Sequence, residues 1–311
     1  MIGLPDIERA RERIAPHVRR TPLLRAAPLR DSLGNLDLHL KLESLQVTGS
    51  FKARGAVNRV LAMPREQLAK GLVTASGGNH GLGVAYAGAV AGAAVTIYLP
   101  ANAPREKAAK LARWGAEVVW EGELWDDSDL AARAAAAASG AAYVHSFSEP
   151  DVIAGQGTVG LEILEDFPDL DLLVVAIGGG GLISGVATAV KALRPGLRLV
   201  GVEPIGAPTL TESVKAGRVV ELAKVETAAN TLAPRKSEEL NLEIVRRLVD
   251  EIVLVSDEEM TAAARWIWFE TGIAAELSGA AAVAALRTGR VDPGSARRTA
   301  AIVCGAGTAG L

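Results

Sequence analysis

Short runs rich in valine, isoleucine and leucine alternate along this chain with longer alanine- and leucine-rich segments that have helical periodicity. This alternation is typical of βαβ units, which form parallel sheets covered by helices. One sheet containing every predicted strand would be very wide, so we expect an α/β fold with two open, twisted, mostly parallel sheets flanked by helices. The pattern predicts strands over Leu38–Leu42, Leu72–Ala75, Val95–Leu99, Glu117–Trp120, Tyr143–Phe147, Leu172–Ile177, Leu197–Val202, Ile252–Val255 and Thr299–Cys304.

Helical patterns fill most gaps between the predicted strands. Arg105–Trp114 precedes Gly115, a residue type that often ends helices, and Ser128–Ala138 is a second, alanine-rich helical segment. A third helix begins near Phe51 and is expected to end before Pro64, because proline cannot continue a helix.

The composition narrows the class of protein. The chain has 311 residues, of which 49% are hydrophobic and 22% charged, so it can bury a large core beneath a solvated surface. Its net charge is -3 and no Lys/Arg block stands out, so we expect no nucleic-acid binding. Cys304 is the single cysteine, which excludes an internal disulfide and a multi-cysteine metal site. The N-terminus does not resemble a signal peptide and the apolar stretches are too short to span a membrane, so we expect a cytoplasmic protein.

Lys52 lies where a predicted strand gives way to a helix. The strand Leu38–Leu42 is followed by a polar turn, and the next helix starts with Ser50 as its expected N-cap. Lys52 then falls in the first helical turn, where the partial positive charge of the helix end opposes an ammonium ion. Partial burial would oppose it further, which favours the neutral amine that a Schiff base requires. The alternative is an ordinary solvated lysine.

A glycine-rich turn follows the strand Leu72–Ala75, with the sequence Ser76-Gly77-Gly78-Asn79-His80-Gly81. Glycines let backbone amides approach a ligand, and a helix that begins near Asn79 points its N-terminus at the same place. Such a turn suits a carboxylate, and the Asn79 side-chain amide suits a phenolic oxygen. The alternative is a structural turn with an Asn/His cap.

Four consecutive glycines, Gly178–Gly181, follow the strand Leu172–Ile177 and precede a helix. Glycine is costly in conformational entropy, so a purely structural loop rarely contains such a run. As a nest of amides at a helix N-terminus, the run is suited to hold a phosphate without a cationic side chain. It matches neither a Walker A loop nor the dinucleotide-binding glycine pattern. The alternative is a plain turn.

A Schiff-base lysine, an anion-binding turn and a phosphate-binding turn are the parts that pyridoxal phosphate chemistry needs. The segments Ser50–Ala56, Ser76–Gly81, Val152–Thr158 and Gly178–Gly181 together resemble the fold-type II pyridoxal-phosphate enzymes, whose fold is like that of tryptophan synthase β. Within these enzymes the segments resemble the serine/threonine dehydratase and serine racemase family. The resemblance runs from about Ile7 to the C-terminus, with the motifs in the same order.

The resemblance implies roles in cofactor binding. Lys52 would form the Schiff base with pyridoxal phosphate, Phe51 would lie beside the cofactor, and Asn79 would bond its 3′-oxygen. Cys304 stands where the family usually has a serine that faces the pyridine nitrogen. A thiol is a weaker donor than a hydroxyl, an ionised thiol would stabilise a protonated ring, and the simpler alternative is a small buried residue with an unused thiol. The phosphate would lie against Gly178, Gly179, Gly180, Gly181 and Leu182.

The resemblance also implies where the substrate lies and how the chain is organised. Ser76, Gly77, Asn79 and His80 would surround the substrate carboxylate, mainly through backbone amides. Two domains are expected: a large cofactor-binding domain over residues 1–70 and 148–311, and a small mobile domain over residues 71–147 that closes on the substrate. A homodimer is expected from the family. The chain ends soon after Cys304, so we expect no regulatory domain of the kind attached to some threonine dehydratases.

By this resemblance the chain is a lyase that removes the β-hydroxyl and amino groups of a small L-hydroxy amino acid such as threonine or serine, giving a 2-oxo acid and ammonia. Lys52 would remove the α-proton. The similar racemases have a serine hydroxyl where this chain has Gly77, which has no side chain to donate a proton, so dehydratase is favoured and serine racemase is the alternative. A binding protein of the same fold without turnover is disfavoured, because Lys52 and Asn79 are intact.

Two segments near the expected site depart from the family pattern. Residues 229–231 read Ala-Asn-Thr in place of Ala-Asp-Gly, and residues 276–279 read Glu-Leu-Ser-Gly in place of Glu-Pro-Ser/Thr-Gly/Ala. They leave β-elimination intact but make 3-hydroxyaspartate a candidate substrate beside threonine. Some members also bind a structural divalent cation, for which Glu203 and the Ala207 carbonyl are candidate ligands. Thr209 stands where a second carboxylate is expected, which favours a capping glutamate instead.

Overall fold

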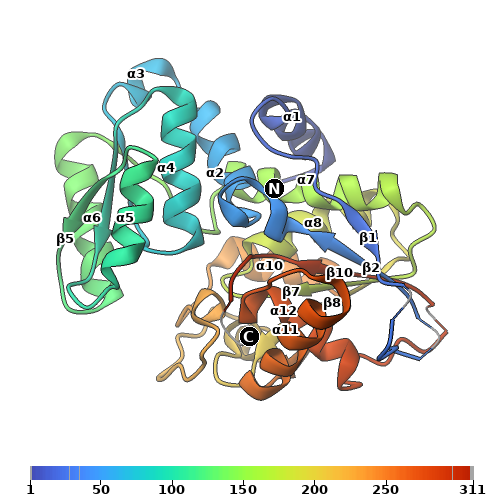
Figure 1. Cartoon of the computed structure of the whole chain (residues 1–311). Coiled ribbons are helices and arrows are strands. Elements are labelled where there is room, and N and C mark those ends of the chain that lie inside the picture. Colours follow the sequence, from blue (N-terminus) through green and yellow to red (C-terminus); the bar gives the residue numbers. More distant parts are fainter. Residues whose placement is uncertain (1, 28, 35, 296, 309–311) are drawn as a thin grey trace.

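The computed structural model of the chain describes residues 2–27, 29–34, 36–295 and 297–308, and its strands form two sheets (Figure 1). The six-stranded sheet has the order β1-β2-β10-β7-β8-β9, and the four-stranded sheet has the order β5-β4-β3-β6. Strand β1 is antiparallel to β2, and the other neighbouring strands are parallel. The strands are β1 (Leu23–Arg25), β2 (Asp37–Leu42), β3 (Leu72–Ala75), β4 (Val95–Leu99), β5 (Glu117–Trp120), β6 (Ala142–Tyr143), β7 (Leu172–Ala176), β8 (Arg198–Pro204), β9 (Glu251–Val255) and β10 (Arg298–Val303).

Helices connect and cover the strands, as the βαβ pattern predicts. In Figure 1, α7 and α8 lie on one side of the six-stranded sheet, and α11 and α12 lie on the other. Because both faces are covered, the central strand β7 is buried at every position. The helices are α1 (Leu4–Ile14), α2 (Lys52–Leu61), α3 (Arg65–Leu68), α4 (Asn79–Ala91), α5 (Arg105–Arg113), α6 (Trp125–Ser139), α7 (Pro150–Asp166), α8 (Gly181–Leu193), α9 (Thr209–Ala216), α10 (Glu239–Leu248), α11 (Asp257–Thr271) and α12 (Leu277–Arg287), with 3-10 turns η1 (Glu43–Leu45), η2 (Val47–Gly49) and η3 (Asn230–Leu232).

The predicted α/β fold with two mostly parallel sheets is confirmed. Most predicted strands differ from the observed bounds by at most two residues at either end, but the predicted strand Tyr143–Phe147 is wrong beyond its first residue. The chain turns there because the Nδ1 of His145 accepts hydrogen bonds from the amides of Phe147 (3.3 Å) and Ser148 (3.0 Å). The pattern does not predict β1, which has three residues, two of them exposed.

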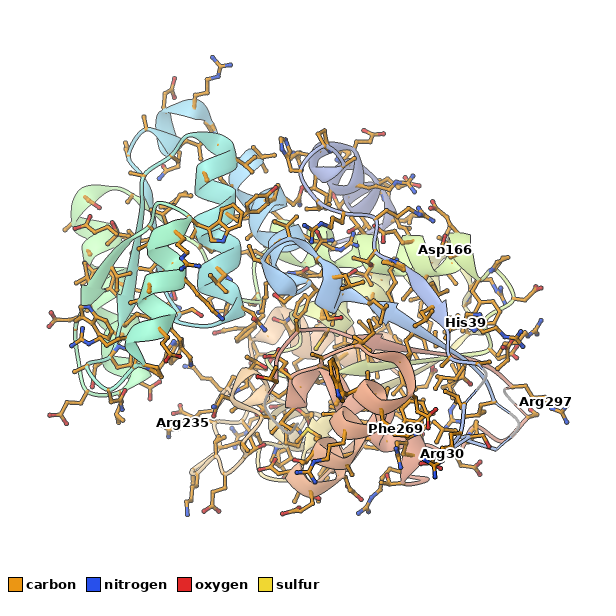
Figure 2. All side chains as sticks on the ribbon, viewed as in Figure 1. Arg30, His39, Asp166, Arg235, Phe269 and Arg297 are labelled. Atoms are coloured by element: carbon orange, nitrogen blue, oxygen red, sulfur yellow. The ribbon has the colours of Figure 1, made fainter. Side chains whose placement is uncertain are left out.

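The four-stranded sheet forms a lobe beside the larger sheet. Figure 1 shows it together with α4, α5 and α6, and its strands all fall within residues 71–147. Arg235 pairs with Asp126 of α6 at 3.4 Å, and Figure 2 shows Arg235 on the side of the larger lobe that faces the smaller one. That residues 71–147 move as a unit stays a prediction. Among the described residues, no helix combines the length and apolar character needed to cross a bilayer.

Candidate functional site

Three segments that carry candidate residues leave neighbouring strands at one edge of the six-stranded sheet. Lys52 follows β2, Cys304 follows β10 and Gly178 follows β7, and β10 lies between β2 and β7. Since these strands are parallel, their carboxyl ends place the three segments side by side, where open α/β sheets bind ligands. The turn after β3 of the other sheet joins them, because α4 packs on α2: a Cβ at Gly83 would lie 3.1 Å from the backbone of Lys52.

Lys52 is the first residue of α2 and is partly buried. As predicted, it occupies the first turn of a helix. Its Nζ donates a hydrogen bond to the carbonyl oxygen of Ser146 (2.6 Å) and lies 5.3 Å from the centroid of the Phe51 ring. Burial lowers the pKa of the Lys52 amine to about 8, although Cys304 and Glu276 act in the opposite direction. The amine is therefore neutral far more often than that of a solvated lysine.

The expected N-cap role of Ser50 is wrong. The N-cap of α2 is Phe51, and the extended backbone of Ser50 forms an isolated bridge with Gly305. The amide of Phe51 donates to the carbonyl oxygen of Cys304 (3.2 Å). These strand-like contacts override the capping preference of serine, and they hold Lys52 beside Cys304.

The glycine run Gly178–Gly181 leads from β7 into α8. Gly180 is the N-cap of α8 and has a φ of 92°, which residues with a Cβ rarely adopt. A Cβ at Gly179 would lie 2.2 Å from the Phe147 ring. Within the described part of the chain, the amides of residues 179–183 have no backbone acceptor. Unpaired amides at a helix N-terminus form a site for an anion such as phosphate.

The turn between β3 and α4 offers a second set of amides. A Cβ at Gly81 would lie 1.9 Å from the carbonyl oxygen of Ser76, so only glycine fits there. The amide of Gly78 donates to the Ser76 hydroxyl (3.3 Å), whereas the amides of residues 79–81 find no backbone acceptor among the described residues. These amides lie in the first turn of α4 and are suited to a carboxylate. Gly77 adds no side-chain proton donor.

The imidazole of His80 is engaged with the neighbouring strands. Its Nε2 lies 3.1 Å from the Thr74 hydroxyl and 3.0 Å from the carbonyl oxygen of Val144. Burial lowers the pKa of His80 to about 3, so the ring is neutral at physiological pH. What His80 can offer a ligand at this turn is therefore its backbone amide.

Sequence reasoning did not assign Glu276 to the site. Its Oε1 accepts a hydrogen bond from the Nδ2 of Asn79 (2.7 Å) and lies 3.4 Å from the hydroxyl of Thr231. Thr231 also donates to the hydroxyl of Ser278 (2.5 Å). Burial raises the pKa of Glu276, and its hydrogen bonds partly offset this rise. The one sequence signal was that residues 231, 276 and 278 belong to the two segments that depart from the family pattern.

Cys304 is buried, and its Sγ donates a weak hydrogen bond to the carbonyl oxygen of Ser278 (3.4 Å). Burial raises the pKa of the thiol well above its usual range, and the neighbouring Glu276 adds to this rise. The neutral thiol is therefore favoured over the ionised form.

Glu203 caps a helix, as the capping interpretation predicts. Its carboxylate accepts hydrogen bonds from the amides of Leu210 (2.7 Å) and Thr211 (2.9 Å) at the start of α9. The carbonyl oxygen of Ala207 accepts from the amide of Thr209 (2.9 Å). Across the described residues, no group of three or more His, Cys, Asp or Glu side chains could hold a metal ion. A cation on Glu203 and the Ala207 carbonyl stays an untested alternative.

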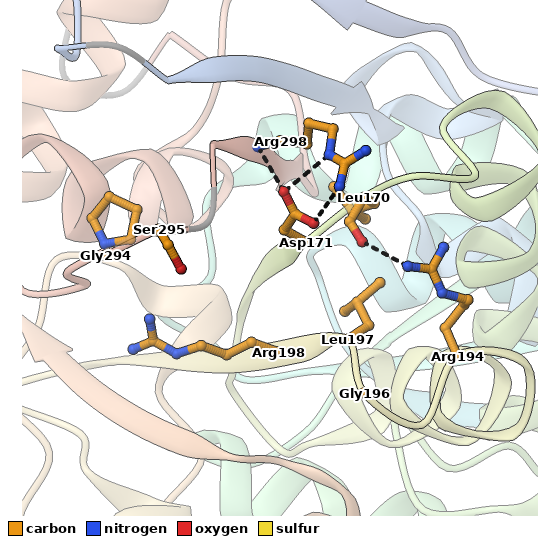
Figure 3. Close-up of a pocket in the computed structure, with 10 residues that line it drawn as sticks. Leu170, Asp171, Arg194, Gly196, Leu197, Arg198, Gly294, Ser295 and Arg298 are labelled. Carbon is orange, nitrogen blue, oxygen red and sulfur yellow. Dashed lines mark hydrogen bonds and ion pairs between the residues drawn. The ribbon is translucent and has the colours of Figure 1, made fainter.

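A cavity of about 560 Å³ lies at the opposite edge of the six-stranded sheet, near the amino ends of β7, β8 and β10 (Figure 3). Its charged groups already have partners, and among them Arg194 donates to the carbonyl oxygens of Pro168 and Leu170. Arg298 bonds both carboxylate oxygens of Asp171, and Arg198 pairs with Glu251 at 2.8 Å. Because the cavity lies away from both glycine turns, we do not include it in the site.

Comparisons with known proteins show the family of this chain. The family described as pyridoxal-phosphate dependent enzyme matches residues 14–305. The L-threonine ammonia-lyase of Thermotoga maritima is 41% identical over 92% of this chain and 71% of its own length. The structure of maize serine racemase is 34% identical and covers 98% of this chain and 93% of that one, with a TM-score of 0.94. The structure of the processed form of threonine deaminase isoform 2 from Solanum lycopersicum is 35% identical and covers 98% of this chain and 83% of that one, with a TM-score of 0.93.

Proposed function

Because this chain belongs to the family of pyridoxal-phosphate dependent enzymes, we propose that it is an ammonia-lyase that converts L-threonine or L-serine to a 2-oxo acid and ammonia. The observation that carries the proposal is the placement of Lys52. Its partly buried amine, with a pKa lowered to about 8, lies at the same sheet edge as the unpaired amides of the glycine run after β7. The unpaired amides after β3 belong to the other sheet and reach the amine because α4 packs on α2.

The site fits pyridoxal phosphate. The unpaired amides of residues 179–183 suit a phosphate, the largely neutral amine of Lys52 suits an aldehyde, and the neutral thiol of Cys304 suits an uncharged ring nitrogen. When bound, pyridoxal phosphate supplies the aldehyde that captures an amine and a ring that accommodates the electron pair left by a departing α-proton.

We assign a separate role in the reaction to each residue of the site. We assign the substrate carboxylate to the amides of residues 79–81 at the start of α4, which would fix the α-carbon near Lys52. Lys52 Nζ is the base that accepts the α-proton, since burial keeps a substantial fraction of it neutral near pH 8. Phe51 packs beside the lysine, and the side-chain amide of Asn79 would donate to the cofactor oxygen next to the aldehyde.

The glycine at position 77 favours elimination over racemisation. Inversion needs a second proton donor on the face opposite Lys52, and Gly77 has no side chain to provide it. The likeness to maize serine racemase keeps racemase as the second candidate. The polar groups of Thr231 and Ser278 beside Glu276 keep 3-hydroxyaspartate as a further candidate substrate.

A substrate panel tests the proposal. We expect the purified enzyme to release a 2-oxo acid and ammonia from L-threonine or L-serine, with less than about a tenth of that rate appearing as D-amino acid by chiral chromatography. The Lys52→Ala variant should still fold but lose release and α-proton exchange with solvent. A wild-type enzyme that releases no 2-oxo acid from threonine, serine or 3-hydroxyaspartate would refute the lyase assignment.

We further propose that the enzyme works in the cytoplasm as a homodimer, with residues 71–147 closing over the substrate. Sedimentation equilibrium would test the dimer. Closure predicts that a substrate analogue lowers solvent access to Trp125, which is 49% exposed on α6 and donates to the carbonyl oxygen of Ala75 (2.9 Å) at the start of the substrate turn.

A further inference from the structure

Two buried polar residues near the start of α10, Ser237 and Asn241, form hydrogen bonds with the glycine run and with the segments beside it. The hydroxyl of Ser237 donates to the carbonyl oxygen of Gly179 (3.0 Å). The Nδ2 of Asn241 donates to the hydroxyl of Ser184 in α8 (3.2 Å) and to the carbonyl oxygen of Phe147 (3.2 Å). Both Ser237 and Asn241 are 0% exposed. The start of α10 is thus tied to the glycine turn and to the first helical residues after it.

The hydroxyl of Ser237 does not cap α10, the helix that follows it. The N-cap of α10 is Glu238, and no side chain caps that helix. A serine just before a helix normally bonds the amides of the first turn, yet here the hydroxyl bonds the glycine turn instead. The hydrogen bond of Ser237 therefore orients the glycine turn and does not cap α10.

The peptide plane explains what this hydrogen bond controls. The carbonyl of Gly179 and the amide of Gly180 belong to one trans peptide unit, so they point in opposite directions. Fixing the carbonyl oxygen on Ser237 turns the Gly180 amide away from α10. Glycine has no Cβ to restrict its backbone, so without this bond the peptide unit can rotate at little cost.

We propose that Ser237 is a positioning residue for the cofactor phosphate, which aims the Gly180 amide into the anion site. This inference rests on the proposed placement of the phosphate at the glycine run. Asn241 assists by packing against Gly180, since a Cβ at Gly180 would lie 3.2 Å from the Cβ of Asn241. Neither side chain touches the reacting atoms.

The test compares two ligands that differ only in the phosphate. The cofactor-free full chain is titrated with pyridoxal phosphate and with pyridoxal, and Lys52 imine formation is followed by absorbance. We expect Ser237→Ala to weaken pyridoxal phosphate binding about fivefold to tenfold, the worth of one hydrogen bond, and to leave pyridoxal binding within about twofold. Ser237→Thr, which keeps the hydroxyl, should restore the wild-type preference for the phosphorylated ligand.

Ser213→Ala is the matched control. Ser213 is also 0% exposed and its hydroxyl also donates to a backbone carbonyl, that of Thr209 (2.7 Å), but in α9. We expect it to change the binding of neither ligand. If Ser237→Ala fails to fold, Ser237→Cys keeps the volume with only a weak donor and should show the same selective loss.

Equal weakening of both ligands by Ser237→Ala or Ser237→Cys, or no change in either, would overturn the proposal. A selective loss supports it whether or not the enzyme proves to be a lyase, because binding is measured without substrate. A wild-type chain that binds both ligands equally well would show that the phosphate does not use the glycine run, which also overturns it.

Discussion

The pKa of Lys52 offers the most direct test of the site. Burial lowers this pKa to about 8, whereas an ordinary lysine has a pKa of 10.5. At pH 7 the neutral fraction is therefore roughly 9% instead of roughly 0.03%, about 300-fold more free amine. Glu276 raises the pKa of Lys52, so replacing its charge should lower that pKa further. The Glu276→Gln substitution keeps an oxygen that can accept from Asn79.

Competitive labelling of the cofactor-free chain can measure this pKa. The rate at which an amine reagent modifies Lys52 is followed by peptide mapping from about pH 6 to 11. We expect a midpoint near 8 for the wild type and a lower midpoint for Glu276→Gln. Glu243→Gln, at an exposed position of α10, should leave the midpoint unchanged. A wild-type midpoint near 10.5 would refute the argument from burial, and an unchanged midpoint in Glu276→Gln would show that Glu276 carries no charge beside the amine.

Two further predictions concern stability. Arg54 is 1% exposed and bonds both carboxylate oxygens of Glu43 and of Glu162. Arg54→Met should lower the free energy of unfolding in urea by about 3–5 kcal/mol, because the buried carboxylate of Glu43 loses its charged partner and Glu162 keeps only Lys41 of its two charged partners. A loss below about 1 kcal/mol would contradict this account. His80 has a pKa of about 3 in the folded chain against 6.5 for a free histidine, so the unfolded state binds a proton that the folded state does not. Stability should therefore fall as the pH falls from about 6.5 towards 3, by about 1.4 kcal/mol per pH unit from this group, and His80→Asn should reduce that slope in thermal unfolding measured at pH 7, 6 and 5.

The sequence could locate the glycine turns because their requirements are local. Gly180 needs a positive φ, and a Cβ at Gly81 would collide with the backbone at 1.9 Å. The sequence could also predict the ends of strands such as β3 and β4, because a short apolar run between turn residues has few alternative structures.

The supporting contacts could not be predicted, because they join distant parts of the chain. Asn79 meets Glu276 across 197 residues, and Ser237 meets Gly179 across 58. The capping preference of serine even gave a wrong prediction. Ser50 stands just before α2 and is expected from the sequence to be its N-cap, yet the N-cap is Phe51. The backbone bridge between Ser50 and the distant Gly305 holds Ser50 extended and overrides its capping preference.

Burial shifts the pKa values of Lys52 and Glu276 in opposite directions, because it disfavours the charged form of each group. Amides neutralise neither a phosphate nor a carboxylate, so each anion that binds there brings negative charge, which stabilises the ammonium form of Lys52. An amine that must act as a base has to start from a lowered pKa, as burial provides here. An ionised Glu276 would add a further negative charge beside the same amine. Its raised pKa makes it easier to protonate as the anions arrive, so the carboxyl group can give up its charge while its oxygen still accepts from Asn79. Burial of both groups therefore acts in one direction, towards a neutral lysine between two bound anions.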